Sequence, residues 1–139
     1  MSITPDQILD LATKLVQQSV EEDIDEVVLR CSTSRAYYAA LHAADNCLPP
    51  DLALTNSERR GKGSHQAVID KVTAWSKAVR PGRTEAIFVA RNLVRLRDLR
   101  KIADYAMSEH FPAADAYTAV RIATETIDRA DRASSQAAA

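Results

Sequence analysis

Apolar residues recur along this chain every three or four positions, the spacing of one buried helix face, in five separate stretches. The alternation of apolar and polar residues that is typical of strands is absent throughout. The periodic stretches predict helices that begin at residue 5, span about 24–47, begin at 64, span about 84–107 and begin at 112. Short links and one long loop join them. The sequence therefore predicts an all-α fold, an up-and-down antiparallel bundle of about five helices.

Each predicted helix has one apolar face that we expect to be buried. In chain order, the expected core positions are Ile8, Leu9, Ala12, Leu15 and Val16; Val27, Cys31, Ser34, Tyr38 and Leu41; Val68, Val72, Trp75 and Val79; Ala86, Val89, Leu93, Leu96, Ala103 and Met107; and Tyr117, Val120, Thr124 and Ile127. The second of these sets places Arg35 and His42 on its flank, at the edge of the core.

Boundary signals support these helices. Thr4 is expected to cap the first helix in a capping box with Gln7, and Pro5 suits the first helical position. The acidic residues at 21–23 favour the start of the second helix through its dipole.

Proline and glycine mark the ends of the middle helices. Consecutive prolines at 49–50 end the second helix, and a Pro-Gly pair at 81–82 ends the third. The segment 50–63 has no periodicity, which predicts a mobile loop, and Ser64 is expected to cap the next helix.

The length of 139 residues is typical of a single domain with its own core. We place that domain at residues 1–133, followed by a flexible Ala- and Ser-rich tail at 134–139. Hydrophobic residues make up 46% and charged residues 27%, an ordinary soluble composition. Without a signal peptide or a long apolar run, the protein is expected to be cytoplasmic and not bound to a membrane.

Cysteine and histidine do not suggest a metal site or a disulfide. Cys31 and Cys47 lie on one predicted helix, about 24 Å apart along its axis, and a disulfide needs Cα atoms within ~7 Å. The three histidines and two cysteines lack paired ligand spacing. We therefore expect no metal and no cofactor.

Basic residues gather in two places, although the formal net charge is only −1. The clustered residues are Arg59, Arg60 and Lys62, and Arg91, Arg95, Arg97, Arg100 and Lys101. A local basic face can bind phosphate even when the whole molecule is near neutral. The run at 61–64 lacks the earlier glycine and the preceding strand of a phosphate-binding loop. Arg60 and Lys62 remain candidates for contact with a polyanion, against the alternative of a solvated linker.

The stretch SRAYYAALH at 34–42 is the first candidate for chemistry. Arg35 and His42 are seven residues apart, so on a helix they point within roughly 20° of each other. Tyr38 lies between them. The arrangement fits a structural histidine at a core edge, or a phosphate site in which His42 transfers a proton and Arg35 stabilises charge.

The late stretch at 97–105 is the second candidate. Arg97, Arg100 and Asp104 share one face, with Tyr105 beside them. They form either a surface ladder with an Arg100–Asp104 pair, or an arginine stripe whose guanidinium groups face phosphate oxygens.

Two segments, SRAYYAALHAA at 34–44 and LRDLRKIADY at 96–105, resemble the HEPN family of small helical bundles. The similarity extends from about Pro5 to Ile127, and the Ser64-His65 step fits it as well. The resemblance implies a bundle that pairs as a homodimer. Many members of the family are metal-independent endoribonucleases, used as toxins or in antiviral defence and often encoded beside a nucleotidyltransferase-type antitoxin. Others are non-catalytic nucleotide-binding or assembly modules, including parts of larger defence complexes.

Active members carry an arginine followed after four to six residues by a histidine, usually on the late helix. In this chain Asp104 stands where that histidine is expected. Arg35 with His42 has the same spacing on the earlier helix, and Arg60 with His65 has it across a loop and a helix start.

Two hypotheses follow. In the first, the protein cleaves RNA: the substrate 2′-hydroxyl attacks the adjacent phosphate, His42 acts as acid or base, and Arg35 and Arg100 hold the phosphoryl oxygens. In the second, the same residues bind a nucleotide or a partner protein without catalysis. The absence of a late-helix histidine favours the second hypothesis, and the Arg35–His42 stripe favours the first.

Overall fold

The computed structural model describes residues 3–21 and 26–139, and in these residues it contains helices and no strand. The elements are α1 (Pro5–Glu21), α2 (Glu26–Cys47), the 3₁₀ helix η1 (Pro50–Leu52), α3 (Asn56–Arg60), α4 (Ser64–Lys77), α5 (Arg83–Tyr105) and α6 (Ala113–Ala138). The predicted all-α fold is confirmed, with six α-helices in the described residues instead of about five. The predicted start of the second helix near residue 24 lies outside the described residues.

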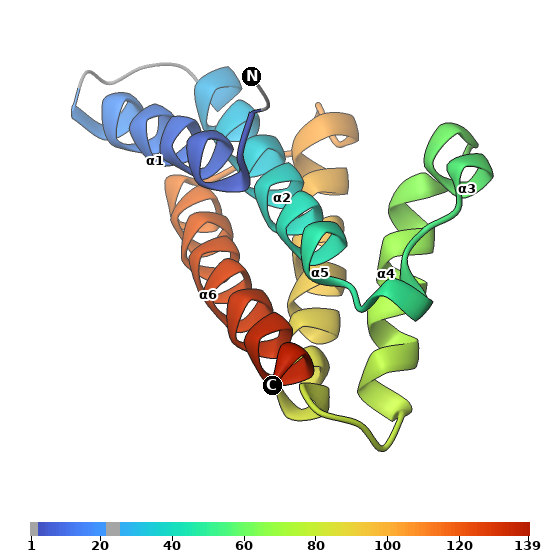
Figure 1. Cartoon of the computed structure of the whole chain (residues 1–139). Helices are drawn as coiled ribbons and strands as arrows, with labels where there is room; N and C mark the ends of the chain where they lie inside the picture. Colours follow the sequence, from blue (N-terminus) through green and yellow to red (C-terminus); the bar gives the residue numbers. More distant parts are fainter. Residues whose placement is uncertain (1–2, 22–25) are drawn as a thin grey trace.

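The second helix is the centre of the bundle. It packs against α1, α4, α5 and α6. In Figure 1, α4 runs downward, α5 runs upward and α6 returns downward, so these three helices alternate in direction. The short α3 packs on α4, and together they form an arm on the right of the molecule.

The start of α1 forms as predicted. The Gln7 backbone N–H donates to Thr4 Oγ1 at 3.2 Å, and the Thr4 backbone N–H donates to Gln7 Oε1 at 2.9 Å. This is the reciprocal capping box. Farther along, Ala12 is buried, and its carbonyl accepts a 2.6 Å hydrogen bond from the Ser32 hydroxyl that ties α1 to α2.

The predicted buried stripe of α2 is mostly wrong. Leu41 is buried, but Val27 and Cys31 are exposed, and Ser34 and Tyr38 are only partly buried. The buried residues of α2 are instead Leu29, Arg30, Ser32, Thr33, Ala36, Tyr37, Ala39, Ala40, Leu41, Ala43 and Ala44. Because α2 is covered on several sides, its small apolar residues occupy much of its circumference, and no single stripe marks the core.

The other core faces agree better with the prediction. The buried positions that the sequence identified are Ala12 and Val16 in α1, Val68, Val72 and Trp75 in α4, Ala86, Val89, Leu93, Leu96 and Ala103 in α5, and Ile127 in α6. Val79 is 97% exposed and Met107 is 66% exposed, so both were wrongly placed in the core. They lie beyond the ends of α4 and α5, where the helical phase that would turn them inward no longer applies. Tyr117 and Thr124 of α6 are also exposed.

The segment predicted as a loop contains η1 and α3. Thr55 and Glu58 form a second reciprocal capping box at the start of α3. The cap of α4 is Gly63, in the left-handed region at φ 85°, and Ser64 is already helical, so the predicted Ser64 cap is wrong.

Gly82 lies in the connection between α4 and α5, where its backbone packs closely against neighbouring residues. Gly82 has φ 87° and caps α5, whereas α4 ends earlier, at Lys77. A Cβ on Gly82 would lie 2.6 Å from Cζ2 of Trp75 and 2.7 Å from the Ala133 carbonyl oxygen. Both the backbone conformation and the space require glycine here.

The C-terminal residues differ from the predicted loose tail. Helix α6 continues through Ala138, and Ala137 packs against the main core cluster. Cys31 and Cys47 are both free, as the spacing predicted. In the part of the chain that the structure describes, every helix is too short or too polar to cross a membrane.

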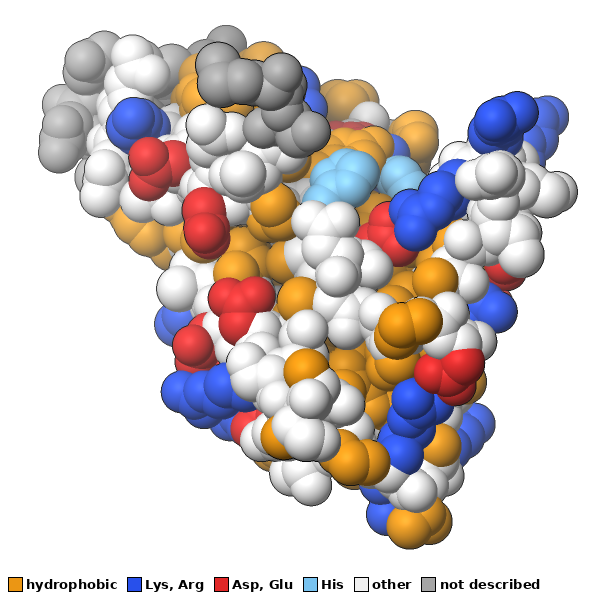
Figure 2. All heavy atoms as spheres, viewed as in Figure 1, with side chains coloured by type: hydrophobic (Ala, Val, Ile, Leu, Met, Phe, Trp, Pro, Cys, Tyr) orange, Lys and Arg blue, Asp and Glu red, His pale blue; other side chains and the backbone are white. Residues whose placement is uncertain are grey.

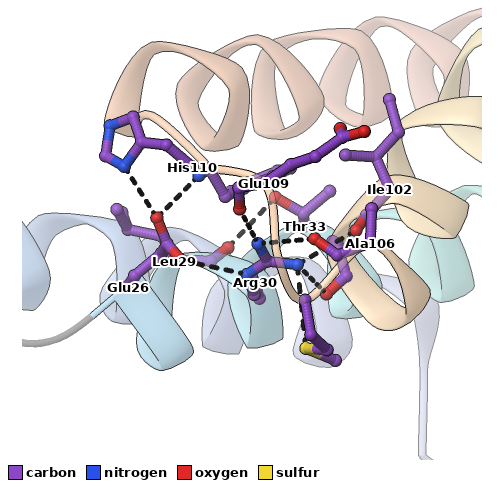
Figure 3. A network of polar contacts seen from close by, with 11 residues as sticks. Glu26, Leu29, Arg30, Thr33, Ile102, Ala106, Glu109 and His110 are labelled. Carbon is purple, nitrogen blue, oxygen red and sulfur yellow. Dashed lines mark hydrogen bonds and ion pairs between the residues drawn. The ribbon is translucent and has the colours of Figure 1, made fainter.

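A buried arginine, Arg30, binds the C-terminal end of α5 (Figure 3). Only 6% of Arg30 is exposed. Its guanidinium donates to the carbonyl oxygens of Ile102, Ala103, Ala106 and Glu109, at 3.0 Å for the first two. These carbonyls lie in the last turn of α5 or just beyond it, where backbone donors become scarce. Two of them also accept from the backbone, Ile102 from the Ala106 N–H and Ala106 from the Glu109 N–H. Arg30 therefore adds side-chain donors at this helix end and fixes α5 to α2.

Glu26 extends this network to the following loop. Its carboxylate lies 3.4 Å from Arg30 Nε, accepts from the Phe111 backbone N–H at 2.6 Å, and lies 2.8 Å from His110 Nδ1. The Phe111 hydrogen bond is the main reason that the pKa of Glu26 is lowered. The network around Arg30 and Glu26 is called the α5 clamp below.

Candidate functional site

Aromatic and basic side chains from three helices meet beside the middle of α2. Tyr38 is the centre: the His42 ring stacks on it at 6.5 Å with a 26° tilt, and the His65 ring meets it edge-on at 5.3 Å. From α5, Arg100 Nη2 donates a 3.2 Å hydrogen bond to the Tyr38 hydroxyl. We call Arg35, Tyr38, His42, His65 and Arg100 the cleft residues. Figure 2 shows histidine side chains on the face between α2 and the α3–α4 arm, which carries Lys and Arg side chains.

Arg100 is held by rings and by one carboxylate. Its guanidinium carbon lies 5.8, 5.7 and 5.5 Å from the ring centres of Tyr37, Tyr38 and Tyr105. Tyr37 is buried, whereas Tyr105 is exposed. Burial acts to lower the pKa of Arg100, but the attraction of Tyr38 and Asp104 outweighs it, and the pKa is raised. Arg100 therefore stays charged at the cleft.

Asp104 forms the predicted i, i+4 pair with Arg100. Its Oδ2 lies 2.7 Å from Arg100 Nε. The two groups form an ion pair but no hydrogen bond, although the Nε is buried. Ser34 also donates to Asp104 at 3.4 Å. The late-helix position where the resemblance expects a histidine is thus occupied by a carboxylate that contacts Arg100.

Arg35 and His42 face the same space, as their spacing predicted. Both are exposed, and together with Tyr38 they line a cavity of about 620 Å³ between α1 and α2. Arg35 and Tyr38 also line a neighbouring cavity of about 440 Å³, which reaches Asp104. In the described residues, the Arg35 guanidinium makes no hydrogen bond or ion pair. Its charge is therefore available to an anion.

His65 is the cleft residue that sequence analysis missed as a site residue. It lies in the first turn of α4, shares a cavity of about 180 Å³ with His42, and contacts both tyrosine rings. Burial lowers the pKa of His65, and the charges of Arg100 and His42 lower it further. His65 is therefore mainly neutral at neutral pH. The Arg60–His65 spacing was the available signal, but Arg60 itself lies in α3 and lines none of these three cavities.

The basic side of the cleft is a shallow cavity of about 380 Å³. Lys62, Arg97, Arg100 and Lys101 line it together with His65. Arg97 donates to Gln66 at 3.0 Å and lies 3.5 Å from Asp98. Of the predicted basic residues, the structure thus brings Lys62, Arg97 and Arg100 together but leaves Arg60 apart.

The site offers proton-transfer and anion-binding groups. Among the described residues, no three His, Cys, Asp or Glu side chains are grouped so that they could hold a metal ion. Comparison with protein-family models, with curated proteins and with solved structures finds no match for this chain. The functional argument therefore rests on the chemistry of the cleft.

Proposed function

We propose that this protein is a metal-independent endoribonuclease that binds the RNA phosphodiester between Arg35 and Arg100. The observation that carries the proposal is that two imidazoles and Arg100, from three helices, contact Tyr38, while Arg35 lines a cavity together with Tyr38. Arginine suits the bidentate recognition of phosphate oxygens. Histidine suits proton transfer near neutral pH.

The reaction needs one base and one acid. The base removes the proton from the ribose 2′-hydroxyl, whose oxygen attacks the adjacent phosphorus, while the P–O5′ bond breaks and the acid protonates the leaving oxygen. The products are a 2′,3′-cyclic phosphate and a 5′-hydroxyl. His65 suits the base, because burial and neighbouring charges keep its imidazole neutral. His42, which is exposed to solvent, is the acid in this scheme.

The wider biological setting is proposed from the HEPN resemblance. It implies a toxin–antitoxin or antiviral defence role in the cytoplasm, a homodimer, and a nucleotidyltransferase-type antitoxin or a larger defence complex as partner. Exposed Val27, Tyr105 and Met107 beside the cleft support a protein contact on that face. Sedimentation at micromolar concentration is expected to give about twice 15.3 kDa. A monomeric mass at that concentration would contradict the proposed homodimer.

A second candidate is a non-catalytic HEPN-like module that binds a nucleotide or assembles with a partner protein. One observation favours it: Asp104 engages Arg100 at the position where the family's active members carry histidine. In that case the cleft binds phosphate without cleaving it.

The deciding experiment is cleavage of total cellular RNA with EDTA present, at matched folded fractions. His42→Ala is expected to lower the rate by ~10²- to 10⁴-fold while the fold is retained. Arg35→Ala is expected to abolish most of the cleavage as well. Arg121→Ala and His110→Ala are the matched controls, since both residues are exposed and lie outside the cleft. His110 also contacts Glu26 in the α5 clamp, so the stability of His110→Ala is measured before its activity is compared.

The possible results separate the two candidates. Loss of cleavage in both cleft variants, with the control variants active, supports the ribonuclease. If the wild type binds RNA but leaves it intact, the non-catalytic module takes its place. If His42→Ala cleaves equally well, His42 is not the acid and the catalytic assignment is wrong.

A further inference from the structure

The cavity of about 620 Å³ between the start of α1 and the middle of α2 is larger than a phosphate site requires. Figure 1 shows the N-terminal turns of α1 beside α2. One wall carries Arg35, Tyr38 and His42, and the opposite wall is apolar. The apolar wall consists of Ile3, Pro5, Ile8 and Leu11. Sites for small organic ligands occupy roughly 300–1,000 Å³ and combine apolar walls with a few polar groups.

We propose that this cavity is a nucleobase subsite, which takes the base of the nucleotide whose phosphate is bound at Arg35. The inference rests on the proposed function in one respect, that the anion at Arg35 is a nucleotide phosphate. The base would lie between the apolar wall and the Tyr38–His42 ring stack, with its edge toward Asn46.

The aromatic wall has the chemistry that bases need. Tyr38 and His42 are nearly parallel, at a 26° tilt, and both line the cavity. Proteins bind unpaired bases by stacking them on aromatic side chains, which tolerates different bases because each has a π face. Leu11 and Ile3, 46% and 76% exposed, are large apolar side chains that a base would cover.

Two amides supply the polar groups. Asn46 is exposed and lines the cavity, and its side chain makes no hydrogen bond within the described residues. Gln7 uses its Oε1 to accept from Thr4, which leaves its NH₂ group as a donor. An amide side chain offers an adjacent donor and acceptor, the pattern that pairs with the edge of a base such as adenine.

The charge of the site selects a nucleotide over a neutral nucleoside. Arg35 lies on the cavity wall and has no partner among the described residues, so it provides one fixed charge for the phosphate. The apolar wall and the amides contribute only to the base. The two contributions therefore belong to different residues and can be removed separately.

The test is titration of the full chain, by calorimetry or amide NMR, with adenosine 5′-monophosphate, ribose 5-phosphate and inorganic phosphate. The nucleotide is expected to bind about tenfold or more tightly than ribose 5-phosphate, the fold-change equivalent to stacking one base. Leu11→Trp, which places an indole in the cavity, is expected to bring the nucleotide to the affinity of ribose 5-phosphate, whereas Asn46→Leu is expected to remove only part of the preference. Val79→Trp is the matched control, since Val79 is 97% exposed and outside the cavity.

The outcomes separate this inference from the proposed function. Equal binding of nucleotide and ribose 5-phosphate, with both weakened by Arg35→Ala, overturns the base subsite and leaves the phosphate site standing. Nucleotide binding that is lost in Leu11→Trp but unaffected by Arg35→Ala supports the base subsite and counts against the proposed phosphate position. Absence of binding by all three probes overturns the base subsite.

Discussion

Two arginines on neighbouring helices show how differently one side chain can be used in this bundle. Arg30 of the α5 clamp is buried and donates to four backbone carbonyls, so its hydrogen-bonding capacity is directed to holding α5 in place. Arg100 lies among three tyrosine rings and a carboxylate, and in the described residues it donates one hydrogen bond, to Tyr38.

The difference concerns what a ligand could still reach. Arg30 is bonded to carbonyls of the α5 end and of the turn that follows it. A ligand could take their place on the guanidinium only if that end of the helix unfolded. Flat rings hold the Arg100 charge without using up its donors, which leaves the guanidinium able to meet phosphate oxygens. We infer that the α5 clamp serves stability and that Arg100 serves binding.

The largest expected effect is on the clamp. Arg30→Met should lower the free energy of unfolding by about 3–5 kcal/mol, because buried carbonyls and Glu26 lose their charged partner. Urea denaturation followed by circular dichroism measures it. Arg30→Lys keeps the charge but lacks the planar fork, so it should recover only part of the loss. A loss below about 1 kcal/mol would show that water replaces Arg30 and that the clamp is not structural.

The comparison is sharpened by the same change at Arg100. Arg100→Met should cost only about 1–2 kcal/mol of stability, as expected for a partly exposed side chain. Affinity for a short RNA should fall about tenfold or more, through loss of a charge-assisted contact. Fluorescence anisotropy at fixed salt measures the affinity, with Arg121→Met as control. A stability loss as large as that of Arg30→Met would remove the distinction between the two arginines.

Asp104 should have a smaller effect on stability. Its pair with Arg100 is partly exposed, with 18% and 27% of the two side chains accessible, so Asp104→Ala should change stability by less than about 1 kcal/mol. If Asp104 positions Arg100 for a ligand, RNA affinity should drop while the melting temperature hardly changes. A large fall in melting temperature would instead make Asp104 part of the structural framework.

The smallest expected effect is the pH dependence contributed by His65. Its pKa is lowered in the folded state, so the unfolded chain binds more protons as the pH falls below the ordinary histidine value near 6.5. The contribution of His65 to stability is therefore complete above that value and declines as the pH falls toward the folded pKa. Urea unfolding at pH 7.5 and pH 5.5 should show a smaller decline for His65→Asn than for wild type. Equal declines would show that His65 is solvated.

Some of the candidate site could be predicted from sequence because it is local. Arg35 and His42 share a face by helical spacing alone, and Arg100 and Asp104 pair at i, i+4. His65 could not be placed in the same way, because its position depends on how α4 packs back against α2 and α5. Arg30 was missed for another reason: a charged residue in a helix is expected on the surface unless its partners are known.

Local rules thus determined the helices and the Thr4–Gln7 cap, since helical periodicity and capping depend on residues within a few positions of each other. The number of helices was nearly correct for the same reason. Only the tertiary structure decided which face of α2 is buried. The helix contacts other helices on several sides, and its alanines are small enough to be buried on more than one of its faces. The tertiary structure also decided which arginine became a clamp, since the carbonyls that Arg30 binds lie more than seventy positions away in the chain.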